Sequence, residues 1–428
     1  MRQPGLFHGE HLPVRVAYQA LFQNLPLFTG GEASSPGRPQ ISRDALLRAL
    51  IYRALRRFTT LTDLVQALHE NPSLLEAIGL DPLFSPVPSV ERFSDWLRQT
   101  DNQVLQTIRI DLLRSLFSEG AFQGRILALD SCPILSPVRE NNLKTAVRDR
   151  FNKLRFPKAD PTARLGVLAS YPRPESRKII FFWGYRNHII VDTETELPLW
   201  EQTHPADRKE SPLAIPLLKA LTSILALPLE AVCADSAYDT EALLKFIVDP
   251  LHAQPVVARH PRHQSNPDFR VQGPVVLCPA NLEMFRRGKM TPRRTGITYQ
   301  QYSCPLHYDR KIQQRFLICP AAHPKFLKQK GCNYLLRLTP NIRSQIPYGS
   351  DSFRRLYRER TAVERVFSRL LTISMQDLPT RGLAAARNLC TIAHITVLLV
   401  ALTAHRLNQP DHLTFVRTFL PNFLDPDS

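Results

Sequence analysis

The chain of 428 residues exceeds the usual size of one domain, roughly 100 to 200 residues, so we expect two or three structural units. Its 43% hydrophobic and 22% charged residues exclude a disordered chain and are typical of a globular protein. Lys and Arg outnumber Asp and Glu by 55 to 38, which leaves a net charge of +17. Such a surplus favours a polyanionic partner, either nucleic acid or an anionic membrane surface.

The N-terminus and the most apolar segment favour a protein that is neither secreted nor inserted in a membrane. Residues 1–14, MRQPGLFHGEHLPV, contain no continuous apolar region and no small-residue cleavage site, so we expect no signal peptide. The longest apolar run, residues 391–404, is shorter than the roughly 20 residues that span a bilayer and contains His394. We predict a buried helix there and no membrane partner. Seven cysteines without a secretion signal indicate reduced thiols and a cytoplasmic location.

The first part of the chain has helical periodicity. Apolar residues recur at three- and four-residue spacing from about residue 41 to 118, in ISRDALLRALIYRALRRF, TTLTDLVQALHENPSLLEAIG and PSVERFSDWLRQT. Thr59 or Thr60 can cap the second of these helices, and Pro88 and Ser89 mark the start of the third. We predict a bundle of helices in this region.

Strand and helix patterns alternate after Gly124. The polar residues 193–196 predict a hairpin turn, and Asp207 and Glu210 have the spacing of a helix capping box. The alternation predicts an α/β sheet flanked by helices. Strand patterns cover residues 125–135, 178–192, 197–203, 229–235 and 254–260, and helical patterns cover residues 204–225 and 240–249.

Residues 261–350 interrupt this alternation. They are rich in Pro, Arg, Gln and Cys and indicate an inserted subdomain, after which the chain is helical again to about Arg406. We therefore predict four segments: an N-terminal helical domain (1–120), the first part of an α/β domain (121–260), the inserted Cys/Arg-rich subdomain (261–350) and the C-terminal helical part of the α/β domain (351–428).

Two acids stand at the ends of predicted strands. Asp130 ends RILALD and Asp235 ends AVCAD. Reactive groups in open α/β sheets gather at the carboxyl ends of strands, where a rigid backbone presents them to a crevice. Two acids on neighbouring strands repel each other unless a cation lies between them, and oxygen ligands suit a divalent cation. The alternative is that each Asp caps the turn that follows it.

A third acid is offered by the C-terminal helical region. At 100° per residue, Tyr357, Arg360 and Glu364 share one face of a helix, whereas Glu359 points about 140° away from Glu364. We interpret Glu359 as a solvated acid among arginines. Arg360, one turn before Glu364, can contact a phosphate, orient the acid or form a plain ion pair within the helix.

Several blocks of the sequence resemble a known family. The blocks LALDSCPI, GYRNHIIVD, ADSAYDT, YRERTAVERVFSRL and RGLAAARN are similar to successive motifs of bacterial insertion-sequence DDE transposases, and the helical region with DALLRALIYRAL and LVQALHENPSL resembles their N-terminal domain. The resemblance covers nearly the whole chain. Tyr357, Arg360 and Glu364 match the family's Tyr-x2-Arg-x3-Glu signature, but the Lys expected seven residues after the Glu is Leu371. Arg369 is a candidate substitute for this Lys, although it is out of register.

The resemblance implies a ribonuclease H-like mixed sheet and a set of catalytic residues. Asp130, Asp235 and Glu364 would be the catalytic acids and the ligands of two Mg²⁺ or Mn²⁺ ions, with Tyr357 and Arg360 in support. The implied enzyme is a DDE transposase that binds the terminal inverted repeats of its own element, cleaves DNA at the ends and transfers the 3′-hydroxyls to target DNA by two-metal phosphoryl transfer.

The implied partner is double-stranded DNA, bound by a homodimer in the bacterial cytoplasm and associated with the nucleoid. Two alternatives stay open: a ribonuclease H-like nuclease without strand transfer, and a transposase-derived DNA-binding protein without catalysis. The presence of all three acids argues against the second alternative. We also considered Asp192, which we interpret as a turn residue, and His188, which we interpret as a structural histidine.

Two basic stretches are candidates for binding phosphates. Residues 144–158, KTAVRDRFNKLRFPK, contain six Lys or Arg and one acid, and residues 286–294, RRGKMTPRR, contain five and no acid. Such runs give affinity without reading sequence, although a solvated surface is the alternative. The DNA-binding candidates are Lys144, Arg148, Arg150, Lys153 and Arg155 in the first stretch and Arg286, Arg287, Lys289, Arg293 and Arg294 in the second.

The inserted subdomain also offers metal-binding side chains. His307 follows Cys304 by three residues and His323 follows Cys319 by four, which could build a Cys2His2 zinc site. Cys278 and Cys332 are alternative ligands. The competing interpretation is a set of thiols without a metal, because the spacing is not one of the familiar paired-cysteine patterns.

Overall fold

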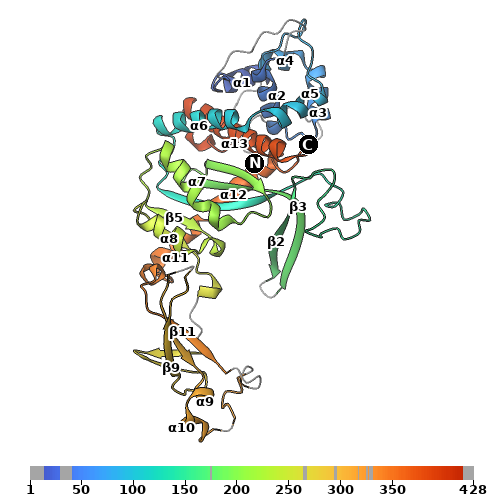
Figure 1. The fold of residues 1–428 in the computed structure, drawn as a ribbon. Coiled ribbons are helices and arrows are strands. Elements are labelled where there is room, and N and C mark those ends of the chain that lie inside the picture. Colours follow the sequence, from blue (N-terminus) through green and yellow to red (C-terminus); the bar gives the residue numbers. More distant parts are fainter. Residues whose placement is uncertain are drawn as a thin grey trace. The chain divides into compact units, whose positions relative to one another are not determined.

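The computed structural model divides the chain into two units, which are described separately. The first unit comprises residues 1–258 and 349–428, and the second comprises residues 259–348. Figure 1 shows the helices and strands of both. The structure describes residues 14–28, 41–173, 176–263, 268–293, 296–316, 318–323, 326 and 331–417.

The first unit is built on a six-stranded mixed sheet. The strands follow the order β2-β3-β1-β5-β6, and β4 pairs with β3 beside β2. β1 runs parallel to β5, and β5 to β6, whereas β1 and β3 are antiparallel. Their bounds are β1 (Ile126–Leu135), β2 (Arg164–Arg173), β3 (Ser176–Asp192), β4 (Pro198–Pro205), β5 (Ala231–Ala234) and β6 (Gln254–Val257). This arrangement confirms the predicted ribonuclease H-like mixed sheet flanked by helices.

The long strand β3 was predicted from residue 178, but its partner β2 was not predicted. β2 pairs with the first half of β3, from Arg164 opposite Gly184 onward, and β4 pairs with the second half. β2 and β3 form a long hairpin that extends from the sheet (Figure 1). Val167 and Phe181 lie opposite each other on this hairpin and are both about two-fifths exposed. The described side chains of β2, at residues 164–168, are exposed or half-buried, and the sequence there lacks a clear alternation of apolar and polar residues.

Helices of the N-terminal region confirm the predicted bundle. Side chains of Ser42, Thr60 and Ser89 cap α2, α3 and α5, and Thr60 forms a capping box with Asp63. α6 packs along α13, which forms the centre of this layer. The bounds are α1 (Val14–Phe22), α2 (Arg43–Leu55), α3 (Leu61–Glu70), α4 (Pro72–Ile78), α5 (Val90–Gln99) and α6 (Asn102–Ser118).

The apolar run at residues 391–404 lies within α13 (Leu383–Arg406), where every residue from 388 to 404 is buried, as predicted. Among the described residues, α13 is the helix long and apolar enough to cross a membrane, but 83% of its most apolar window is buried inside the protein. Burial of this kind is typical of the core helix of a soluble protein.

The helix after β4 begins later than predicted. α7 (Glu210–Ile224) starts at Glu210 with Lys209 at the N-cap position, and no side chain caps it. The predicted capping box of Asp207 and Glu210 is therefore wrong. The reason is that the Glu210 carboxylate accepts hydrogen bonds from Ser131 and Arg186, which lie on β1 and β3. α8 (Glu241–Val248) agrees with its predicted range and is capped by Thr240.

Residues 351–406 form three helices instead of one long helix. α11 (Asp351–Glu359) and α12 (Ala362–Thr372) are separated at Arg360 and Thr361, and α13 follows. The amides of Arg360, Thr361 and Val363 each bond to a carbonyl three residues earlier, so the backbone tightens without reversing direction. The expected alignment of Tyr357, Arg360 and Glu364 on one continuous helix was therefore wrong in detail.

In the part that the structure describes, the second unit has two small sheets and two short α-helices. β7 and β8 form a hairpin, and the order of the other sheet is β11-β10-β9. The bounds are β7 (Arg270–Gln272), β8 (Val275–Leu277), β9 (Phe285–Met290), β10 (Tyr299–Ser303), α9 (Pro305–Tyr308), α10 (Arg310–Gln313) and β11 (Asn333–Arg337). Its core is a small cluster of seven buried residues: Val276, Cys278, Met284, Tyr302, Cys304, Leu306 and Cys332.

Candidate active site

The two candidate aspartates stand side by side on parallel strands. Leu129 of β1 pairs with Ala234 of β5, so the next residues along the two strands are Asp130 and Asp235. β1 continues beyond Asp130, whereas β5 ends before Asp235. Asp235 Oδ1 accepts a hydrogen bond from the backbone amide of Ala237 at 2.8 Å, which orients the carboxylate at the start of a short 3₁₀ turn. The two acids therefore stand at adjacent positions of neighbouring central strands although they are 105 positions apart in the sequence.

Arg360 connects this pair of acids to Glu364. Its guanidinium lies 3.6 Å from Asp130 Oδ2 and 2.7 Å from Glu364 Oε1. α11 packs against β5 and β6, where the Cys233 thiol donates to the Leu356 carbonyl, and α12 packs against β1 and β3. These contacts place the break between α11 and α12 beside Asp130. Glu364 itself is 57% exposed.

Tyr357 lies beside the same group. The Arg360 guanidinium carbon is 5.8 Å from the centre of the Tyr357 ring, which stacks on Phe353. Burial raises the pKa of Tyr357, Arg360 opposes the shift, and the nearby carboxylates of Asp235 and Asp130 add to it. Tyr357 therefore stays a neutral phenol that supports Arg360.

Electrostatics at Asp130 favour an additional positive charge. Burial raises the pKa of Asp130 to about 7, the amide of Ser131 opposes this shift, and the charges of Asp235 and Glu210 add to it. Arg360 provides partial compensation because one guanidinium serves both Asp130 and Glu364. A site with this charge balance attracts cations.

A fourth acid near the aspartates was missed by sequence reasoning. Glu210 accepts hydrogen bonds from Ser131 Oγ at 2.5 Å and from Arg186 Nη1 at 2.6 Å, and its side chain is 18% exposed. A hollow of about 520 Å³ adjoins these residues; its lining includes Arg186, Arg208, Lys209, Glu210 and Ala237. The sequence carried no signal for Glu210 beyond its apparent helix-capping position.

The donor set of Asp130, Asp235 and Glu364 fits Mg²⁺ or Mn²⁺, because hard carboxylate oxygens are the ligands these ions prefer. In the described part of the chain, no three Asp, Glu, His or Cys side chains are already placed so that they could hold a metal ion. At the candidate active site, the reason is that the Glu364 carboxylate accepts a hydrogen bond from Arg360.

Arg369 binds elsewhere. Its guanidinium and that of Arg365 bond the carboxylate of Glu196, which follows the turn between β3 and β4. These ion pairs attach α12 to the sheet. Arg369 is therefore engaged in positioning the helix that carries Glu364, and the terminal basic residue of the family signature has no counterpart at Leu371.

The other acid and histidine candidates have structural surroundings. Asp192 Oδ2 accepts hydrogen bonds from the amide and hydroxyl of Thr195, which confirms the turn interpretation. His188 is 1% exposed beside the ring of His204. Glu359 is exposed, as interpreted from the sequence.

The first basic stretch forms an irregular loop in the first unit. Arg150 donates to the backbone carbonyls of Arg139, Glu140, Asn142 and Thr145, so this side chain holds the loop together. We therefore assign Arg150 to loop structure, contrary to its expected role in DNA binding. Arg155 is paired with Asp149 at 2.8 Å. The exposed cations of the stretch are Lys144, Arg148, Lys153, Arg155 and Lys158.

The second basic stretch lies on the second unit, mostly on β9. Arg286, Arg287 and Lys289 are exposed on this edge strand, and Arg287 lies over the ring of Tyr308 at 5.0 Å. Arg293 is also exposed, and Arg294 lies outside the described residues.

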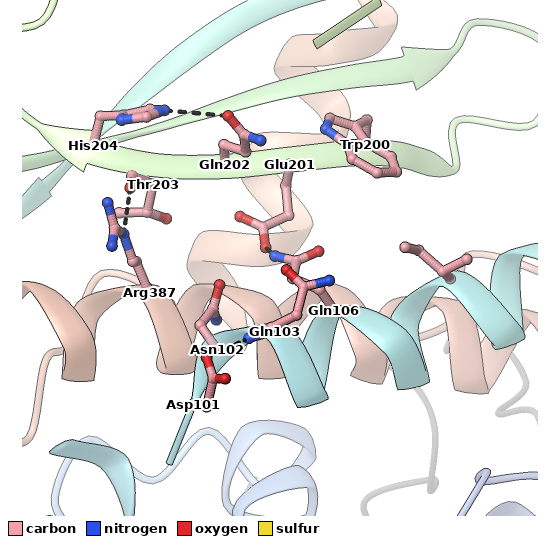
Figure 2. A pocket seen from close by; sticks show the side chains of 11 residues that line it. Asp101, Asn102, Gln103, Gln106, Trp200, Glu201, Gln202, Thr203, His204 and Arg387 are labelled. Carbon is pink, nitrogen blue, oxygen red and sulfur yellow. Dashed lines mark hydrogen bonds between the residues drawn. The ribbon is translucent and has the colours of Figure 1, made fainter. Parts of the chain in front are cut away.

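A polar pocket of about 350 Å³ lies away from the three acids, between the start of α6, β4 and Arg387 of α13 (Figure 2). Beneath it the buried Glu201 accepts hydrogen bonds from Asn187 and Thr391. Arg387 donates to the Thr203 carbonyl. These bonds join the sheet to α13, and we interpret the pocket as part of the packing between layers.

Comparisons with known proteins identify the family. Residues 169–399 match the family described as Transposase DDE domain, and residues 21–99 match the Transposase domain (DUF772). The first match covers more than half of the chain and includes Asp235 and Glu364, whereas Asp130 precedes it. The chain belongs to the DDE transposase family.

Two further comparisons were made with solved structures and with curated proteins. A solved structure of the piggyBac transposase synaptic complex with hairpin DNA is 13% identical with a TM-score of 0.35, over 96% of this chain and 82% of that chain. A comparison with curated proteins found no match.

Proposed function

We propose that this transposase binds the ends of its own element, cleaves the DNA there and joins the 3′-hydroxyls to target DNA. The observation that carries the proposal is the meeting of three distant segments: Asp130 and Asp235 at adjacent strand positions, and Arg360 in contact with both Asp130 and Glu364. Members of a family that transfers phosphoryl groups need acids gathered in this way.

Asp130, Asp235 and Glu364 are the residues that would hold two Mg²⁺ or Mn²⁺ ions. When bound, such ions supply Lewis-acid activation of a water or 3′-hydroxyl and stabilise the leaving oxygen. The protein's own contribution is orientation. The Ala237 amide fixes Asp235, the Ser131 amide fixes Asp130, and the ion pairs of Arg365 and Arg369 fix the helix of Glu364.

Arg360 is also placed to bind a phosphate of the DNA. Its guanidinium is paired with two carboxylates, those of Asp130 and Glu364, and a DNA phosphate entering the site offers it an alternative partner of the same charge. Release of Glu364 by Arg360 would free that carboxylate to act as a ligand. Tyr357 supports the guanidinium from its ring face.

DNA binding is assigned to the two exposed basic surfaces and to the N-terminal helices. Lys144, Arg148 and Lys153 of the loop and Arg286 and Lys289 of β9 are exposed and suit contacts with phosphates. Because an element has two ends, we propose that two copies of the chain act together on DNA, in the cytoplasm and on the nucleoid.

The test is a cleavage and joining assay on DNA that carries the native element ends, with Mg²⁺ present. The Asp235→Asn variant should lose both cleavage and strand transfer while it still binds the ends, because the substitution removes a ligand charge and leaves the fold nearly unchanged. Asp249→Asn, on the exposed C-terminus of α8, is the matched control and should act like the wild type.

Three outcomes would contradict the proposal in different ways. If Asp235→Asn cleaved DNA as fast as the wild type, Asp235 would not be a catalytic residue. Cleavage without joining by the wild-type protein would indicate a nuclease, and binding without either reaction would indicate a DNA-binding protein that has lost catalysis.

A further inference from the structure

The second unit contains a cluster of thiols that the transposase reaction does not use. Cys278 follows β8, Cys304 follows β10 and Cys332 precedes β11, so three strand ends bring three cysteines together. Each is at most 5% exposed. The Cys332 thiol interacts with both other sulfurs. All three are free cysteines.

The backbone around these sulfurs is arranged to stabilise negative charge. Amides of Ala280 and Leu282 point to the Cys278 sulfur, and amides of Leu306 and Cys332 point to the Cys304 sulfur. Thiolates, and not thiols, are the form that binds metals.

The chain forms the same tight turn after two of these cysteines. Asn281 donates its amide to the Cys278 carbonyl at 2.8 Å, and His307 donates to the Cys304 carbonyl at 3.1 Å. Such a turn places residues i and i+3 on one side, which is the spacing of paired zinc ligands. His307 stands at i+3 after Cys304, and among the described residues its buried Nε2 has no hydrogen-bond partner.

Gly331 permits the third segment to come this close. Its φ is +54°, and a Cβ atom there would lie 2.4 Å from Cys304 Cβ and 2.6 Å from His307 Cδ2. The backbone just before Cys332 therefore rests directly on the turn of Cys304 and His307. A side chain at residue 331 would separate the groups.

We propose that Cys278, Cys304, Cys332 and His307 bind one structural zinc ion. Tetrahedral ligands at about 2.3 Å from zinc hold neighbouring sulfurs roughly 3.8 Å apart, close to the separation of hydrogen-bonded thiols. The four groups do not yet form a coordination sphere. Binding replaces the thiol protons and requires rotation of side chains, as expected for a site that releases protons on loading.

The composition of the core gives zinc a structural purpose. Among the described residues of this 90-residue unit, three of the seven buried residues in the core cluster are the cysteines. A core so small rarely stabilises a fold alone, and structural metals are a common supplement. The site differs from the Cys304, His307, Cys319 and His323 set expected from the sequence, because the sulfurs of Cys278 and Cys332 replace Cys319 and His323.

The experiment measures zinc in the full-length protein, purified with a mild reductant and no chelator. We expect one zinc per chain by mass spectrometry of the metal, and release of that zinc when a mercurial reagent titrates the thiols. Exchange for Co²⁺ should give the intense near-ultraviolet bands of thiolate ligation and the visible bands of a tetrahedral site. These readouts need no variant and no DNA activity.

Variants then assign the ligands. Cys278→Ser and Cys332→Ser should lose most of the zinc, and His307→Ala should shift the Co²⁺ bands and weaken retention against a chelator. Cys319→Ser is the matched control, because Cys319 packs against the cluster but is not one of the proposed ligands. This variant should keep the full zinc content.

Wild-type protein without zinc that also fails to bind added Zn²⁺ or Co²⁺ would overturn the proposal, as would a disulfide between two of the three cysteines in freshly purified protein. Zinc loss in Cys319→Ser but not in His307→Ala would overturn the assignment of His307.

Discussion

At the scale of single residues, Arg360 is the group on which the candidate active site depends. It lies at the break between α11 and α12, contacts Asp130 and Glu364, and packs on the ring of Tyr357. A flat guanidinium can contact two carboxylates at once, whereas an ammonium is a single point charge. This difference makes Arg360 testable by a substitution that keeps the charge.

We expect Arg360→Lys to lower DNA cleavage on the order of 10²-fold, because small misplacements of reacting groups have effects of that size. End binding should change little, since the net charge is the same. Cleavage rates under single-turnover conditions measure the effect. Arg358→Lys, at an exposed position of α11, is the control, and equal rates for both variants would argue against a role for Arg360 in orientation.

His188 provides a prediction about pH. Burial lowers its pKa to about 3, from 6.5, and the charges of His204 and Arg186 act in the same direction. Below pH 6.5 the unfolded chain binds a proton that the folded chain does not bind, so stability is complete above 6.5 and is lost as the pH falls toward 3.

The variant His188→Leu should therefore lose less stability on acidification. Its free energy of unfolding should fall less steeply than that of the wild type between these limits, by up to about 1.4 kcal/mol per pH unit. Urea unfolding at a series of pH values measures this slope. Parallel slopes for the two proteins would show that His188 is protonated in the folded state as well.

The residue scale also shows what the sequence could and could not predict about the site. Asp130 and Asp235 were predictable because each follows a buried strand segment, a purely local signal. Glu210 was missed because its hydrogen-bond partners, Ser131 on β1 and Arg186 on β3, are far from it in the sequence. Arg150 looked like a DNA contact for the same reason: its carbonyl partners are set by the path of a loop, which no periodicity describes.

At the scale of secondary structure, burial decided which elements were predictable. α13 and β5 were predicted because they are buried and have few polar interruptions. β2 was missed because it lies on a hairpin that is exposed on both faces, as the consecutive β3 residues Ile180 and Phe181 show. The break between α11 and α12 was missed because both helices have good periodicity and their junction departs from it by a single tightened turn.

Contacts between elements give a prediction about stability. Asn388 of α13 is fully buried, and its amide donates to the carbonyls of Leu97 and Thr100 at the end of α5. Asn388→Ala should lower the free energy of unfolding by about 2–3 kcal/mol, since two carbonyls at the end of α5 lose their donor. Urea denaturation measures the change. Gln99→Ala, at an exposed position of α5, should have little effect, and a similar loss in both variants would contradict this account.

At the scale of the whole molecule, the excess of 17 positive charges is concentrated in part on exposed segments. The loop of residues 144–158 belongs to the first unit and β9 to the second, so each unit carries its own basic surface. β9 is an edge strand, and its charged side chains also protect the open edge from pairing with other chains. Solubility and DNA binding are therefore competing explanations for the same charges.

The salt dependence of binding separates these explanations. Replacing Arg286, Arg287 and Lys289 by Ala should weaken binding to element ends and to unrelated DNA by the same factor, because phosphate contacts carry no sequence information. Each lost contact should reduce the slope of log affinity against log salt by about one unit. Fluorescence anisotropy over a range of salt concentrations measures both quantities.

The control is Arg125→Ala, which removes an exposed arginine that is already paired with Glu230 at 2.5 Å. It should leave the slope unchanged. An unchanged slope in the triple variant would mean that the charges of β9 serve solubility alone. A selective loss of binding to the element ends would mean that the second unit reads sequence, because phosphate contacts alone weaken all DNA equally.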